Sequence, residues 1–229
     1  MICVILAAGK GTRMGDLSEV TPKPMLKVLG KTLLEHKILN LPEEIDEVII
    51  VVGHLKNTIT DFLGAYCCGK KISYVVQEEL LGTAHSLLQC KNLLIKEKKF
   101  LVLMGDDIYS KEDLTSAVKG GWGIGVSSVA NIKGKSKIVF DREGHIDEIL
   151  EKYPREAEGY ICTGMYVLSP KIFDYEMRII PGGEFGLPQT ILSAKKDFKI
   201  KALLSKFLVQ VTTPEDLKLA EKYLKRNKI

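Results

Sequence analysis

Buried strands and amphipathic helices alternate along the first half of this sequence, and no other feature limits its fold as strongly. Short runs of β-branched and aliphatic residues predict strands at Ile2–Leu6, Glu47–Val52, Ile72–Gln77 and Phe100–Met104. Apolar residues at helical spacing predict helices between them, at Thr32–Leu41, Asn57–Leu63, Thr83–Leu94 and Lys111–Val118. Because strands joined through helices run parallel, the pattern predicts an α/β fold with helices on both faces of a mainly parallel sheet.

The pattern changes after Gly120, where strands follow one another without intervening helices. Strands are predicted at Gly123–Asn131, Ser136–Asp141, His145–Leu150 and Tyr160–Leu168, with a turn at Arg142–Gly144 in the middle pair. Helices return at Pro170–Tyr175, Phe185–Ala194 and Pro214–Lys225. With no linker-like stretch or repeat, we expect one domain over residues 1–229, divided into halves 1–120 and 121–229. The expected fold is a single-domain, Rossmann-like three-layer sandwich with a mixed, mainly parallel sheet and an antiparallel extension.

Composition narrows the possible partners and the compartment. The formal net charge is only +4, which does not indicate a nucleic-acid partner, and the basic run Lys222–Lys228 fits a solvated helix end better than a binding patch. The five cysteines show neither paired nor zinc-like spacing, so we expect free thiols in the cytoplasm. The apolar residues 2–8 are too few for a signal peptide or a membrane span, and we expect no membrane partner.

A glycine-rich loop, Leu6-Ala7-Ala8-Gly9-Lys10-Gly11-Thr12-Arg13, follows the first predicted strand. Small residues allow a ligand to approach the backbone closely, and successive N–H groups can bind phosphate oxygens. The spacing matches neither a P-loop nor a dinucleotide-binding fingerprint, because Met14 stands where the fingerprint needs glycine. Downstream, the prolines of Thr21-Pro22-Lys23-Pro24 stiffen the backbone around one lysine. Loop and lysine together predict a phosphate site.

These two segments, LAAGKGTRM and TPKPML, resemble the signature of the sugar-phosphate nucleotidylyltransferase superfamily. The resemblance covers most of the chain and is most specific up to about residue 170. It implies that the first half binds a nucleoside triphosphate and the second half an acceptor phosphate. It further implies that the loop wraps the triphosphate and that Arg13 and Lys23 contact the phosphates during catalysis; the loop residues concerned are Leu6, Ala7, Ala8, Gly9, Gly11 and Thr12.

The segment from Gln77 to His85 matches the superfamily motif QxxxLGTAH. The Gln77 amide offers both a donor and an acceptor to a base edge, and Gly82 allows main-chain groups to approach the ring. The resemblance assigns Gln77, Gly82 and Thr83 to the nucleotide base and favours uracil or thymine. We expect His85 to pack or cap rather than to act as a catalytic base.

The fourth predicted strand leads into Gly105-Asp106-Asp107. A carboxylate at the carboxyl end of a buried strand is well placed to hold Mg²⁺ against phosphates. An aspartate here could also cap a helix, as Asp107 or Ser110 could. Because Gly-Asp is the metal position of the superfamily, the resemblance implies that Asp106 binds Mg²⁺.

The acceptor side resembles the superfamily less closely. Glu151 and Lys152 match its "EK" pair, Thr163 and Gly164 its "TG" pair, and Glu184 its sugar-contacting Gly-Glu pair. All five are therefore expected to bind the acceptor, with a charged strand end as the alternative for Glu151 and a helix-cap acid for Glu184.

Three departures from the superfamily pattern bear on substrate and metal. Cys162 stands where the acetamido-sugar enzymes have asparagine, and Gly134–Lys137 replaces their glycine-rich loop. Ser136-Lys137-Ile138 instead resembles the inositol-phosphate cytidylyltransferases. Gln210 occupies a position where relatives carry a metal-binding Asp or Asn, and a neutral amide is a poorer Mg²⁺ ligand than a carboxylate.

The sequence thus predicts an enzyme that joins a nucleoside triphosphate, with UTP or dTTP favoured, to a sugar-1-phosphate and releases pyrophosphate. The alternatives are a CTP-dependent enzyme for inositol phosphate or another polyol phosphate, and a nucleotide-binding regulatory relative without turnover. A glycosyltransferase is less compatible because Gly105-Asp106-Asp107-Ile108 lacks an Asp-x-Asp metal motif. The sequence does not indicate an oligomeric state.

Overall fold

One mixed sheet organises the computed structural model, which describes residues 1–11, 20–206 and 208–227. Its strand order is β11-β10-β12-β7-β1-β4-β6-β5. The parallel core consists of β7 (Phe100–Met104), β1 (Ile2–Leu6), β4 (Glu47–Val52) and β6 (Lys70–Val76). Three of the four strands have the predicted bounds, and the fourth starts and ends slightly earlier than predicted. The α/β prediction with a mainly parallel core is confirmed.

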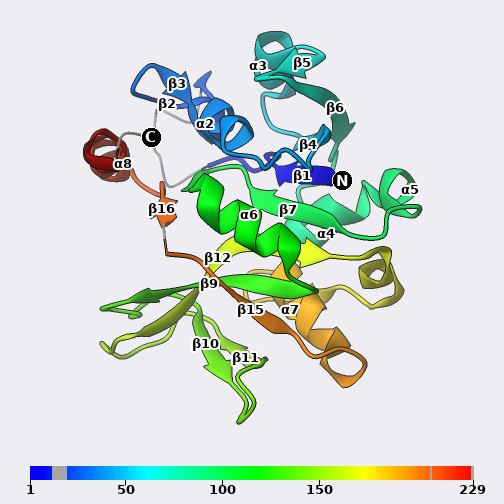
Figure 1. Ribbon diagram of the computed structural model, residues 1–229, viewed down its shortest axis with the longest axis vertical. Helices are drawn as coiled ribbons and strands as arrows, with labels where there is room; N and C mark the ends of the chain where they lie inside the picture. The colour runs from blue at the N-terminus through cyan, green and yellow to red at the C-terminus, as the bar shows by residue number, and fades with distance from the viewer. Residues whose placement is uncertain (12–19, 207, 228–229) are drawn as a thin grey trace.

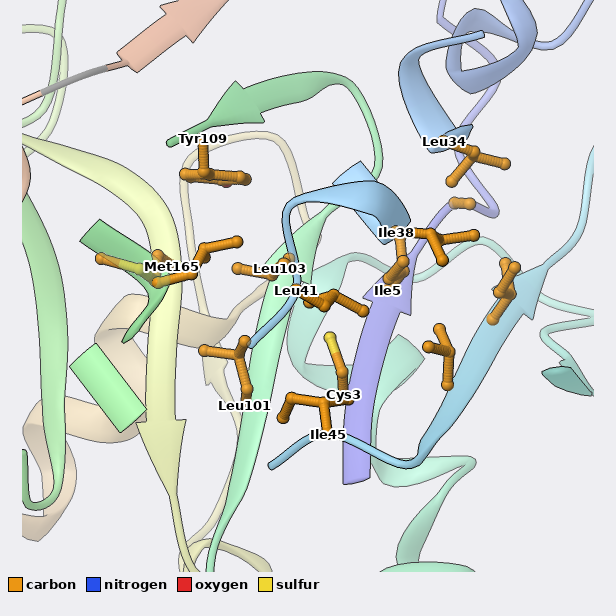
Figure 2. Packing of buried hydrophobic residues seen from close by; sticks show 14 of the residues in the cluster. Cys3, Ile5, Leu34, Ile38, Leu41, Ile45, Leu101, Leu103, Tyr109 and Met165 are labelled. Carbon is orange, nitrogen blue, oxygen red and sulfur yellow. The ribbon is translucent and has the colours of Figure 1, made fainter. Parts of the chain in front are cut away.

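Helices cover both faces of this sheet, as the alternating pattern predicts (Figure 1). On one face lie α2 (Leu33–Leu39), α3 (Lys56–Leu63) and α6 (Lys111–Lys119), which pack on a core that includes Ile5 and Leu103; Figure 2 shows part of it. On the other face lie α4 (Thr83–Leu88), α5 (Lys91–Leu94), the 3-10 turn η3 (Pro170–Asp174) and α7 (Leu187–Leu192), around Val4 and Val102. Strand residues alternate between the two cores because side chains alternate across a sheet.

The second half extends the same sheet in the antiparallel direction. Strand β12 (Gly159–Leu168) pairs antiparallel with β7, with β9 (Gly123–Val129) and, through Ile161, with β10 (Lys137–Phe140). Strand β11 (Ile146–Leu150) closes the predicted hairpin with β10, which projects from the body in Figure 1. Asp141 Oδ1 stabilises the turn by accepting from the backbone N–H groups of Glu143 and His145. Strand β15 (Lys201–Leu204), which was not predicted, pairs in parallel with β9.

Three predicted helices form shorter α-helices than expected, and the first of them, predicted over Thr32–Leu41, is reduced to Leu33–Leu39. The helix predicted over Thr83–Leu94 breaks at Gln89 and Cys90, where the chain makes tighter bonds such as Cys90 N–H to Leu87 O. The helix predicted over Phe185–Ala194 starts only at Leu187, because Phe185–Gly186 forms strand β14 with β13 (Arg178–Ile179). Pro188 lies in the first turn of α7, where its missing N–H costs nothing, and the 3-10 turn η4 (Ser193–Lys196) follows.

Short elements at the edge of the fold assemble around the C-terminal helix. They are the 3-10 turn η2 (Lys23–Met25), the hairpin of β2 (Lys27–Val28) and β3 (Lys31–Thr32), and the antiparallel pair β8 (Asp107–Tyr109) and β16 (Leu208–Gln210). Strand β5 (Tyr66–Cys67) ends the main sheet beside β6, at the edge opposite β11. Helix α8 (Pro214–Asn227) packs against β2 and β16 through a small core that contains Leu26, Val211 and Leu224 (Figure 1). Because β8 pairs with β16 here, the turn of Gly105 and Asp106 between β7 and β8 is fixed at the same place.

Candidate active site

The loop after β1 forms one wall of a cavity of about 530 Å³ at the carboxyl ends of the parallel strands. The strands on either side anchor this loop: Ala7 N–H donates to Val51 O at 2.9 Å, and Gly105 N–H donates to Leu6 O at 2.9 Å. Of the predicted nucleotide-binding residues in this loop, those that line the cavity are Leu6, Ala7, Ala8, Gly9 and Gly11. Thr12 and Arg13 lie outside the described residues.

Lys23 and Asp106 meet at this cavity from distant parts of the chain. Lys23 Nζ lies 2.6 Å from Asp106 Oδ2, and both residues line the cavity. Pro22 precedes η2 and Pro24 lies within it, so the backbone that carries Lys23 has little freedom. The Lys23 side chain is only 7% exposed and that of Asp106 is 28% exposed, which leaves the carboxylate accessible to a ligand.

Two buried ionisable residues, Lys37 and Asp107, lie next to the turn that carries Asp106. The buried Lys37 ammonium donates to the backbone oxygen of Asp107 and lies 5.3 Å from the ring centroid of Tyr109. Burial lowers the pKa of Lys37 to about 8, an effect that the negative charge of Asp107 opposes. Burial raises the pKa of Asp107 well above its usual range, and the neighbouring charge of Asp106 adds to this. Lys37 and Asp107 therefore support the turn that carries Asp106 and do not face the cavity.

The segment from Gln77 to Ser86 forms the opposite wall. Gln77, Gly82 and Thr83, for which base binding is predicted, all line the cavity. Gly82 has a φ of +100°, and a Cβ there would lie 2.6 Å from Phe185 O, so only glycine fits between the loop and β14. Phe185 N–H donates to Leu81 O at 2.7 Å and Leu187 N–H donates to Thr83 Oγ1 at 2.9 Å. These bonds fasten the second half of the chain to the first.

The five predicted acceptor residues occupy three different environments. Glu184 lines the cavity beside Gly82. Glu151 and Lys152 are exposed at the end of β11 and do not line it; Glu151 accepts from Ser136 Oγ at 2.6 Å and from Gln189 Nε2 at 2.5 Å. Thr163 and Gly164 are buried in β12, where Thr163 O accepts from Tyr109 OH at 2.9 Å. The structure thus brings only Glu184 of these five to the cavity wall.

Several cavity residues were not predicted from the sequence. They are Lys10, Pro24, Leu80, Ser86, Met104 and Gly105. Lys10 lies within the glycine-rich loop, so a count of cations near the phosphates could have included it. Ser86 is buried on α4, and its hydroxyl has no hydrogen-bond partner among the described residues, which leaves it available to a ligand. One helical turn from Thr83, it offered no sequence signal of its own.

The donor set at Asp106 fits a hard divalent cation that also binds substrate phosphates. One accessible carboxylate faces the cavity, and Mg²⁺ in such sites is commonly held by one or two carboxylates together with phosphate oxygens and water. Asp107 does not add a second carboxylate, because it is buried beside Lys37.

Among the described helices, none is long and apolar enough to span a bilayer.

Comparison with known proteins assigns the chain to a family. A family model described as nucleotidyl transferase matches residues 2–184, and the chain belongs to this family. Curated relatives include bifunctional protein GlmU of Methanocaldococcus jannaschii, 32% identical over 227 residues that make up 98% of this chain and 54% of that protein. Bifunctional protein GlmU of Francisella tularensis subsp. novicida is 37% identical over 210 residues, 85% of this chain and 44% of that protein. The chain spans about half the length of these curated relatives.

Solved structures agree with this assignment. HddC from Yersinia pseudotuberculosis is 26% identical, with a TM-score of 0.77 and coverage of 97% of this chain and 99% of that chain. The same protein has been solved in complex with GMP-PN, at a TM-score of 0.76. A structure from Bacillus anthracis, provisionally described as a glucose-1-phosphate thymidylyltransferase, has a TM-score of 0.82; at 24% identity it supports the fold alone.

Proposed function

We propose that this chain transfers a nucleotidyl group from a nucleoside triphosphate, with UTP or dTTP favoured, to a sugar-1-phosphate and releases pyrophosphate. One observation carries the proposal: the glycine-rich loop, Lys23, Asp106 and the Gln77–Gly82 segment all line one cavity. This arrangement provides groups for phosphates and for a base within a single site. Family membership supports the reaction class.

The reaction is an in-line displacement in which a phosphate oxygen of the acceptor attacks the α-phosphorus and pyrophosphate leaves. Because the attacking phosphate is already anionic, the chain needs no nucleophile of its own. The backbone N–H groups of the loop and the cations Lys10 and Lys23 orient the triphosphate and stabilise the charge that spreads over its oxygens. Arg13, beyond the described residues, is proposed to do the same.

Mg²⁺ is the proposed cofactor, and Asp106 is the residue that would hold it. When bound, the ion would neutralise phosphate charge during the transfer. The ion pair with Lys23 holds the Asp106 side chain at the cavity wall.

Acceptor binding is proposed for Glu184 at the cavity wall and for Glu151, Lys152, Thr163 and Gly164 farther out. One alternative is a polyol phosphate used with CTP, motivated by the resemblance of Ser136-Lys137-Ile138 to the inositol-phosphate cytidylyltransferases. All five cysteines are unpaired, which supports a proposed cytoplasmic location. Neither a nucleic-acid nor a membrane partner is proposed, and no oligomeric state is assigned.

The rival function is nucleotide binding without turnover, and Gln210 motivates it. Gln210 pairs with Asp107 across the β8–β16 ladder, so an amide and not a carboxylate lies opposite the residue that follows Asp106. A pyrophosphate-release assay separates the two functions. It would combine each of ATP, GTP, CTP, UTP and dTTP with a panel of sugar and polyol phosphates at saturating Mg²⁺. Pyrophosphate release that depends on one acceptor supports the enzyme, whereas nucleotide binding without release on any acceptor supports the rival.

A further inference from the structure

The Gln77 side chain is held in one orientation at the cavity wall. Gln77 is 3% exposed and follows β6, where its backbone N–H donates to Val52 O at 2.8 Å. Its side-chain nitrogen, Nε2, donates to the backbone oxygen of Gly82 at 3.2 Å. A carbonyl oxygen can only accept, so this contact determines which end of the amide is the nitrogen.

His85 provides a second acceptor for the same nitrogen. His85 Nδ1 lies 3.0 Å from Gln77 Nε2. Because the Gln77 nitrogen donates, Nδ1 must accept, and in the neutral ring the proton is then on His85 Nε2. On the outer side of the ring, Nε2 of the exposed Gln89 lies 3.1 Å from His85 Nε2 and donates to the backbone oxygen of His85 at 3.2 Å. A neutral ring accepts through one nitrogen only. If the buried contact with Gln77 sets the tautomer, the exposed Gln89 amide has to rotate and present its oxygen to Nε2–H.

With both hydrogens of its amide directed at Gly82 O and His85 Nδ1, Gln77 has only its oxygen, Oε1, left for a ligand. We propose that His85 is a positioning residue that holds the Gln77 amide with its oxygen available to the cavity, so that the site selects a base with an N–H group on its ring edge. This inference rests on the proposed function and adds a specificity determinant to it.

The selection follows from the chemistry of the bases. Uracil and thymine carry a hydrogen on N3, which can donate to Gln77 Oε1, whereas N3 of cytosine carries a lone pair that would face the same oxygen. If the amide turned over, its NH₂ group would face the cavity and cytosine N3 would become an acceptable partner. Gly82 O opposes this rotation, and His85 adds to it in the tautomer whose Nδ1 accepts, because an inverted amide would then place its oxygen against two acceptors.

The inference is tested with two substitutions at His85 and one control. His85→Leu keeps the approximate volume and removes the acceptor, whereas His85→Asn restores an acceptor the same number of bonds from Cα as Nδ1. Gln89→Ala removes only the outer contact. We expect the ratio of kcat/KM for UTP over CTP to fall about tenfold in His85→Leu, to recover substantially in His85→Asn and to stay within about twofold of wild type in Gln89→Ala.

A second readout does not depend on turnover. In ¹⁵N-labelled protein, the Gln77 side-chain NH₂ signals should exchange slowly with solvent in wild type and His85→Asn, and much faster in His85→Leu. Unchanged exchange and an unchanged UTP:CTP ratio in His85→Leu would overturn the inference, as would a wild-type preference for CTP over UTP. If wild type releases no pyrophosphate from any triphosphate, the proposed function fails, and the amide exchange alone then decides whether His85 holds Gln77.

Discussion

The ammonium of Lys23 lies 2.6 Å from the Asp106 carboxylate, although the two residues are 83 positions apart in the chain. The pair joins the turn after β7 to the proline-flanked segment η2, with the glycine-rich loop against the same cavity. Two opposite charges held together at a phosphate site can serve two partners once substrate arrives: the lysine can bind phosphate oxygens, and the carboxylate can bind a cation.

Removal of either charge should abolish most activity. We expect Lys23→Met and Asp106→Asn each to lower turnover about 100-fold or more, because each removes one electrostatic contact to the reacting phosphates. The double variant should lose much less than the product of the two single losses, because the residues act on the same phosphates. Initial rates of pyrophosphate release measure all three.

Lys56→Met is the matched control for this pair, because Lys56 forms an exposed ion pair with Glu78 at 3.6 Å, away from the cavity. It should change turnover less than about twofold and the free energy of unfolding by less than about 0.5 kcal/mol. Near-normal turnover in Lys23→Met or Asp106→Asn would reject the role proposed for that residue.

Gly82→Ala should be strongly destabilising. The new Cβ would combine an unfavourable backbone conformation, φ +100°, with contacts of 2.6 and 2.7 Å to the backbone of Phe185. Backbone strain of about 1–2 kcal/mol and overpacking of about 1–3 kcal/mol together predict a loss of about 3 kcal/mol in the free energy of unfolding. Urea denaturation gives this value.

Gly144→Ala separates the two contributions. Gly144 also has a positive φ, +83°, but a Cβ there would meet nothing within 4 Å. Its loss should be about 1 kcal/mol, from backbone strain alone. If Gly82→Ala and Gly144→Ala lost the same free energy of unfolding, β14 could move away from Gly82 at little cost.

The buried pair of Lys37 and Asp107 should behave non-additively. Lys37→Met removes one of the two cations that act on the Asp107 carboxyl, and Asp107→Asn removes one of the negative charges that act on the buried Lys37 ammonium. We expect each single variant to lose about 3 kcal/mol of unfolding free energy or more, and Lys37→Met/Asp107→Asn to lose less than the sum, because the attraction between the two groups is then lost only once. Additive losses by urea denaturation would mean that the two groups do not interact.

Above about pH 9, the buried Cys90 thiol should make the free energy of unfolding depend on pH. Burial raises the pKa of Cys90 from 9.0 to about 12. Between these two values the unfolded chain has lost the proton and the folded chain retains it, so the free energy of unfolding falls as pH rises. From pH 8 to 10.5, Cys90 should account for about 2 kcal/mol of that fall.

Cys90→Ala should therefore show a shallower decline than wild type over this range in urea denaturation. Ile191→Val removes one methyl group from the same core and should lower stability by a similar amount at both pH values, about 0.5–1.5 kcal/mol. A decline equally steep in Cys90→Ala and wild type would contradict the assigned cause.

Local sequence signals predicted the parallel core and its helices well, because each buried strand is a continuous apolar run. They did not predict β8, β15 and β16. Each of these is a short segment whose strand conformation depends on a partner far along the chain: β8 pairs with β16 and β15 with β9. A segment of three or four residues that pairs with a distant strand is too short to show a periodic hydrophobic pattern of its own.

The candidate site was predictable to the extent that its residues follow strand ends. The loop after β1, Gln77 after β6 and Asp106 after β7 reach one edge of the sheet because parallel strands share a direction. The role of Ser86 and the contact between His85 and Gln77 could not be foreseen, since both depend on how α4 is oriented against the loop. The environments of Thr163 and Gly164 likewise depend on Tyr109, which the unpredicted strand β8 carries.

The antiparallel joint between β7 and β12 has a mechanical consequence. Backbone pairing joins β7, beneath the nucleotide loop, to β12, which carries Thr163, and β12 through β10 to β11, which ends just before Glu151. This pairing opposes a hinge motion in which the two halves would rotate as rigid bodies relative to each other. Any tightening around substrates must come from local rearrangement, and the projecting β10–β11 arm, anchored at its base through β12, is the part of the described chain best placed to move.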